Sequence, residues 1–158
     1  MANTQSMTTS FMGELMTATH NFGTAPVRAV TTADTFKAAL YLTSATINAA
    51  TTAYSSTGEV TGTGYTAGGV TVTNATAPIA TNSSATAGVA YWTPSASITY
   101  TTVTLSTAFD AVLIYNSTQS NKAVSVHTFG SQTITAGTFT LTMPSNTTST
   151  ALLRLSTT

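Results

Sequence analysis

The sequence predicts an all-β protein: an antiparallel β-sandwich or jelly-roll with a short N-terminal helix, with a barrel as a further all-β alternative. Threonine accounts for 40 of the 158 residues, and its β-branched side chain favours strands. About eight to ten short strand-like runs follow one another, and Gly-, Ser- and Asn-rich segments separate them, as in antiparallel sheets. We expect one domain, with an N-terminal arm over residues 1–26 and a β domain over 27–158.

The arm contains the predicted helix, over residues 10–16. Phe11, Met12, Leu15 and Met16 fall on one face of one or two helical turns. A helix this short needs a surface to lie on, and the methionines suit an irregular apolar surface. Two interpretations stay open: the segment covers one end of the protein's own core, or it binds a partner.

The first half of the β domain alternates strands with loops. Residues 34–42 place Phe36, Ala38, Leu40 and Leu42 on one parity, which is the pattern of a half-buried strand. Five glycines in residues 51–69 predict turns or an ordered surface loop. A strand restarts over 70–73, and the small polar residues of 74–87 predict a second, mobile loop.

The second half contains the clearest local signal, a β-hairpin. The apolar run 108–116 predicts a buried strand, 116–121 a polar loop, and 123–129 an antiparallel return. Earlier in the chain, the apolar parity switches between Tyr100 and Val103, which predicts a β-bulge near Thr101 and Thr102. Further strands are expected over 89–92, 138–143 and 152–155.

Composition excludes several classes of function. Lys+Arg is 4 and Asp+Glu is 4, too few basic residues for a nucleic-acid surface. No apolar run is long enough to span a bilayer, and the N-terminus lacks the features of a signal peptide. The chain has no cysteine, so disulfides and thiolate sites are excluded. With so little charge to protect its strand edges, the protein is expected to oligomerise.

The ionisable residues predict no catalytic, cofactor or metal site. A triad could be drawn from His20 or His127 with Asp34 or Asp110, but with 17 Ser and 40 Thr such a pairing carries no information. The four acids stand far apart in the sequence, unlike the carboxylate clusters of calcium sites. His127 has the parity opposite to its apolar neighbours, so it is expected to face solvent or an interface.

Two repetitive features have simple interpretations. The segment GTGYTAGG at 62–69 lacks the Gly-Lys-Ser/Thr ending of a phosphate-binding loop and indicates a turn-rich loop. Thr-x-Thr triplets suggest an ice-binding array, but they show no regular period.

Four segments carry a resemblance to a known group of proteins. These are FMGELMTATHNF (11–22), DTFKAALY (34–41), TTAYSSTGEVTGTGYTAGG (51–69) and AVLIYNSTQSNKAV (111–124). Together they resemble small virion proteins of tailed bacteriophages, encoded among head and tail morphogenesis genes. The nearest functional analogues are the capsid cement, or decoration, proteins of short-tailed cyanophages, β-rich trimers at three-fold positions on the outer shell.

The resemblance implies a non-enzymatic capsid cement protein, made in the host cytoplasm and placed on the outer capsid surface of the virion. Its expected partners are the major capsid protein and two further copies of itself. The apolar face of the arm, not the resemblance, makes Phe11, Met12, Leu15 and Met16 the expected capsid-interface anchor. The alternative is a neck, tail or fibre-associated β module that binds a host glycan through Trp92 and nearby tyrosines. A secreted adhesin or surface-layer module is a third possibility, against which the missing signal peptide counts.

Overall fold

The computed structural model describes residues 3–8, 11, 14–15, 19–20, 22, 33–73, 78–81 and 89–156. Within these residues the protein is all-β and its sheets are antiparallel, as the sequence predicts. Of the predicted helix over 10–16, only Phe11, Glu14 and Leu15 are described. The helix is therefore not established, and Met12 and Met16 lie outside the described residues.

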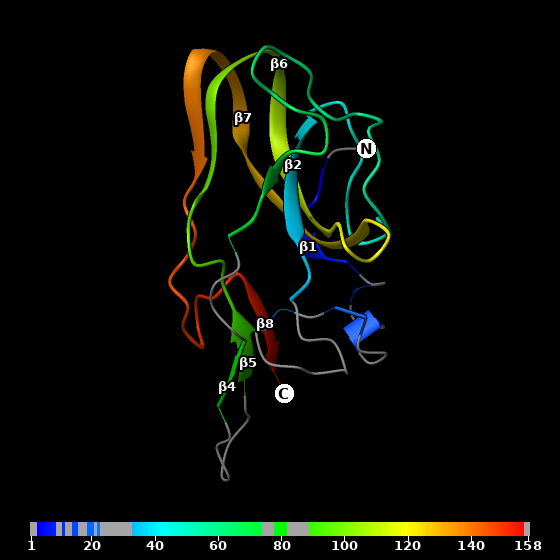
Figure 1. Ribbon diagram of the computed structural model, residues 1–158, viewed down its shortest axis with the longest axis vertical. Coiled ribbons are helices and arrows are strands. Elements are labelled where there is room, and N and C mark those ends of the chain that lie inside the picture. The colour runs from blue at the N-terminus through cyan, green and yellow to red at the C-terminus, as the bar shows by residue number, and fades with distance from the viewer. Residues whose placement is uncertain are drawn as a thin grey trace.

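The strands form two sheets (Figure 1). The larger sheet has the order β1-β7-β6-β2-β3, and the smaller one β4-β5-β8. In Figure 1 the smaller sheet lies at one end of the molecule, below the larger one. The strand bounds are β1 Ser6–Met7, β2 Phe36–Leu42, β3 Val70–Thr71, β4 Ile79–Ala80, β5 Val89–Trp92, β6 Ile98–Asn116, β7 Lys122–Leu141 and β8 Leu153–Ser156.

The predicted hairpin is confirmed and is much longer than the local signal indicates. β6 and β7 pair antiparallel from Asn116↔Lys122 to Ile98↔Leu141. Their connection turns through Ser120 and Asn121, both in the left-handed region with φ of 52° and 58°. Asn tolerates this conformation better than most residues.

The predicted bulge is also confirmed. The β6–β7 register shifts between Tyr100 and Val103, and Thr102 has a φ of 53°. Further shifts follow as far as Ala111, and bulges bend strands. The hairpin therefore curls (Figure 1), and the Tyr100 hydroxyl reaches back to donate a 2.8 Å hydrogen bond to the carbonyl oxygen of Ala38 on β2.

This curl gives β2 a core on each side. On one face, Phe36, Ala38 and Leu40 are fully buried against residues from both halves of the bent hairpin. On the other face, Ala39 and Tyr41 are buried in a second cluster that includes residues of the loop after β2. The prediction of a half-buried strand is therefore wrong, because distant segments cover the face that alternation assigned to solvent.

The two predicted loops differ in outcome. Residues 51–69 form an ordered loop that ends at Gly69, where φ is 70° and an added Cβ would lie 1.6 Å from the Ala38 carbonyl oxygen. Only glycine permits β3 to approach β2 so closely. The predicted second loop, 74–87, contains the short strand β4 and otherwise lies mostly outside the described residues.

Candidate functional site

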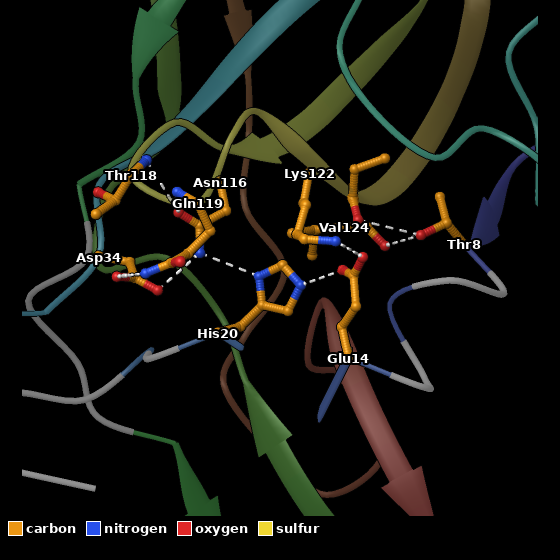
Figure 2. Close-up of polar contacts among 10 residues, drawn as sticks. Thr8, Glu14, His20, Asp34, Asn116, Thr118, Gln119, Lys122 and Val124 are labelled. Carbon is orange, nitrogen blue, oxygen red and sulfur yellow. Dashed lines mark hydrogen bonds and ion pairs between the residues drawn. The ribbon is translucent and has the colours of Figure 1, made fainter. Parts of the chain in front are cut away.

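Two parts of the N-terminal arm meet the turn of the β6–β7 hairpin (Figure 2). The His20 side chain is fully buried, and its Nε2 lies 2.7 Å from Oε2 of Glu14. The other carboxylate oxygen of Glu14 accepts a 2.5 Å hydrogen bond from Nζ of Lys122, the first residue of β7. Glu14 thus connects the buried imidazole to a partly exposed cation more than a hundred residues away in the chain.

Asn116, the last residue of β6, fixes the other side of the imidazole (Figure 2). Its Nδ2 lies 3.0 Å from Nδ1 of His20 and 2.8 Å from Oδ2 of Asp34. An amide NH₂ only donates, so Nδ1 accepts and the His20 proton resides on Nε2, facing Glu14. The amide is held in this orientation because its Oδ1 accepts hydrogen bonds from the backbone N–H groups of Thr118 and Gln119.

The electrostatics match this geometry. Burial lowers the pKa of His20, and the attraction of Glu14 only partly offsets it. A proton on Nδ1 would also point at the amide donor of Asn116, so the neutral imidazole is the form that fits. For Glu14, burial acts to raise the pKa, but the hydrogen bonds from Lys122 and His20 outweigh it and the pKa is lowered. The arrangement fastens the arm to the hairpin turn through an ionised carboxylate and a neutral imidazole.

The residues of the hypothetical triad do not assemble. His20 and Asp34 both contact the side-chain amide of Asn116, while Asp110 accepts a hydrogen bond from Asn3 at a different place. His127 is half-buried and its Nε2 lies 2.9 Å from Oγ of Ser125. Within the described ranges, no three His, Asp or Glu side chains gather closely enough to hold a metal ion.

His127 lines a cleft of about 280 Å³ between the two sheets, shared with Leu153 and Arg154 of β8. Burial lowers its pKa to about 4, so the imidazole is neutral near pH 7. His127 is thus half-buried between the two sheets, and its expected contact with solvent or with another chain stays a prediction.

A second buried carboxylate, Glu59, belongs to a site that the sequence did not predict. Its two oxygens accept 2.6 Å hydrogen bonds from the hydroxyls of Tyr54 and Tyr65, and Oε1 also accepts from the backbone N–H of Gly68 at 2.8 Å. Tyr115 stacks on Tyr54 with ring centroids 4.7 Å apart. Burial and the hydrogen bond to Glu59 raise the pKa of Tyr54 and Tyr65. The sequence feature that could have predicted this site is the pair of tyrosines that flank Glu59, five residues before it and six residues after it.

An apolar pocket of about 100 Å³ lies between the arm and the smaller sheet. Of the predicted anchor, Phe11 and Leu15 line it. Phe11 is only 2% exposed and packs edge-on against Phe22, so most of its ring belongs to the protein's own core, whereas Leu15 is half-buried. Further lining residues are Met7, Phe22, Trp92, Leu153 and Leu155.

Trp92 was the residue proposed to contact a glycan. It is 2% exposed and packs against Phe22 and Phe36, with centroid distances of 4.8 and 6.1 Å. Its indole is therefore part of the core and does not present a stacking face to solvent.

No protein-family model, no curated protein and no solved structure matches this chain. The part of the chain that the structure describes holds no helix with the length and hydrophobicity that a membrane crossing needs.

Proposed function

We propose that this chain is a non-enzymatic structural protein of a tailed-phage virion, a capsid cement protein that binds the outer capsid surface as a homotrimer. The proposal starts from the four segments that resemble phage virion proteins. The outer edge of β7 supports it most strongly, because that edge offers the kind of surface that a structural partner would cover.

β1 pairs with β7 only at Ser125 and Val126. Beyond them, over residues 128–141, no described residue makes a backbone hydrogen bond to the edge that faces away from β6. These 14 residues include five threonines and a serine and contain no charged residue. Unpaired N–H and C=O groups along such an edge are a ready template for another chain.

The outer edge of β7 is also irregular, which disfavours pairing with arbitrary strands of other chains. The step of four positions from Thr128 to Gln132 on β7 lies opposite a step of only two positions, from Phe109 to Ala111, on β6. In addition, Ala136 has a φ of 46°. Bulges of this kind twist an edge away from chance partners. A capsid surface with a matching contour would bury the edge through backbone and hydroxyl hydrogen bonds. A trimer would make that contact three times. Expansion of the shell would then have to break all three contacts together.

The proposal is tested with particles assembled without this protein. Such particles should still form but should release DNA at lower temperature than complete particles, and adding the purified chain should restore the higher temperature. Because the proposed contact is uncharged, restoration should be nearly as effective at high salt as at low salt. Particles that lack the protein and release DNA at the same temperature as complete ones would contradict the cement role.

Thr133→Pro provides a matched variant for this test, since Thr133 is exposed on β7 and proline removes its backbone N–H and disfavours strand pairing at that point. Ser149→Pro, at an exposed position outside the strands, is its control. The first variant should fail to restore particle stability while the second succeeds. Equal restoration by both would show that the β7 edge does not contact the shell.

A further inference from the structure

The smaller sheet leaves apolar surface on both of its faces. Among the described residues, the large apolar side chains classed as exposed are Ile79 at 42% and Leu155 at 44%. Both belong to this sheet, on its two outer strands β4 and β8. The other described large apolar residues are at least partly buried. Two exposed apolar side chains on one small sheet therefore indicate a surface that is covered when the protein functions.

The strand register assigns the two side chains to opposite faces. Leu155 pairs with Ala90, and Leu153 pairs with the buried Trp92, so these residues share the face that the apolar pocket occupies. Ile79 pairs with Tyr91, which has the opposite parity on β5, although Tyr91 and Pro78 also contribute to the wall of the pocket. Residues that pair laterally in a sheet point to the same face, so Ile79 projects from the face away from the pocket.

The pocket fits a single apolar side chain. Its volume is about 100 Å³, and the residues that line it are apolar, among them Leu15, Phe22 and Leu155. Because the pocket is open and its lining is apolar, an apolar side chain that enters it removes apolar surface from water.

We propose that Ile79 of one copy inserts into the apolar pocket of the next copy, head to tail, and that this contact closes the ring of three. This inference rests on the homo-oligomeric part of the proposed function and names the surfaces involved. One chain carries both the projecting side chain and a pocket of matching size and chemistry. Because they lie on opposite faces of one sheet, the contact is heterologous, and such a contact gives a ring when the rotation between copies closes and an open filament when it does not.

The cysteine-free chain allows a direct test by disulfide trapping of the full-length protein. Ile79→Cys and Leu155→Cys are prepared as separate proteins, mixed in the reduced state, re-equilibrated and then oxidised. Leu155 lies at the pocket, so the mixture should give a cross-linked dimer that contains one of each variant. Either variant oxidised alone should give none, since neither residue meets its own copy in a head-to-tail contact.

Thr133→Cys is the matched control, because Thr133 is equally available to oxidant but lies on β7. Mixed with Leu155→Cys, it should not cross-link above background. Cross-linking of Ile79→Cys alone would show a two-fold contact, and absence of cross-linking in the mixture, or equal cross-linking by the control, would remove Ile79 from the interface. Each of these results overturns the inference.

Sedimentation gives a second measurement. Ile79→Asp should convert the trimer to a monomer of unchanged circular dichroism, since the side chain is already partly exposed in the single chain. Thr133→Asp should leave the trimer intact. A trimer that survives Ile79→Asp would contradict the inference. Both tests use free protein, so they measure the contact between copies separately from attachment to the virion. If the mixed variants cross-link but the protein is absent from purified particles, the head-to-tail contact is supported and the cement role is refuted.

Discussion

The two sheets of this protein differ in how completely the chain buries them. In the larger sheet, β2 is covered on both faces, and Ala39 and Leu40 are each 0% exposed. In the smaller sheet, the core face is covered at Trp92 but not at Leu155, which is 44% exposed. The curled hairpin therefore closes the core of the larger sheet. The core face of the smaller sheet stays partly open at Leu155, where the proposed second copy would cover it.

The same contrast separates the buried polar groups. Glu59, beside the larger sheet, is bonded by groups from one continuous stretch, Tyr54 to Gly68. Glu14 and His20, on the N-terminal arm, are bonded to each other and to residues at the β6–β7 turn, Asn116 and Lys122, which lie 96 and 108 residues further along the chain. Local satisfaction makes the first site part of a folded loop, whereas the second site decides whether the arm stays on the β domain.

The largest expected difference comes from the same substitution in each sheet. Leu40→Ala should lower the free energy of unfolding by about 2–5 kcal/mol, because it opens a cavity in a closed core. Leu155→Ala should lower it by less than about 1 kcal/mol in the monomer, because water already reaches that side chain. Urea unfolding followed by tryptophan fluorescence measures both. Equal losses would show that the two sheets are equally closed.

An intermediate effect is expected at Glu59. Glu59→Ala should cost about 3 kcal/mol, because two tyrosine hydroxyls and the Gly68 N–H lose their acceptor at once. Glu59→Gln should cost less, since its carbonyl can accept from Tyr65 and Gly68 and its amide can donate to Tyr54. Urea unfolding of the two variants tests this, and a Gln variant as unstable as the Ala variant would mean that the negative charge itself is required.

A pH dependence of stability is expected at His127, between the two sheets. The pKa of His127 is lowered from 6.5 to about 4, so below about pH 6.5 the unfolded chain takes up a proton that the folded chain refuses. Its contribution to stability therefore falls as the pH drops from about 6.5 to about 4. The lowered pKa values of His20 and Glu14 act in the same direction.

His127→Gln keeps a hydrogen-bonding side chain beside Ser125 but does not titrate. Its urea midpoint should fall less between neutral and acidic pH than that of the unaltered chain, and the remaining fall should belong to His20 and Glu14. If the variant loses as much stability on acidification as the unaltered protein, His127 does not couple pH to folding.

Local patterns in the sequence predicted the local structure. Polar residues 116–121 between two apolar runs predicted the hairpin turn, and the parity switch after Tyr100 predicted the bulge that Thr102 makes. These features depend on side-chain periodicity and turn chemistry, which are encoded within a few residues.

Contacts that depend on how the folded chain covers a strand could not be predicted in this way. Alternation assigned Ala39 and Tyr41 to solvent, but both are buried in a cluster that includes Ala45 and Ile47 of the following loop. Asn116 meets His20 across 96 residues, and no local pattern announces such a pair. The apolar face of the arm was apparent in the sequence, but its division between Phe11 in the core and Leu15 at the pocket depends on how the smaller sheet lies against it.

The central claim, that this chain decorates a capsid, is tested most directly by its copy number in purified virions, measured by quantitative mass spectrometry against the major capsid protein. The account predicts hundreds of copies per particle, close to one trimer for each local three-fold position of the shell. A count of about six or twelve would make the chain a neck or fibre component, and absence from the particle would contradict a virion role altogether.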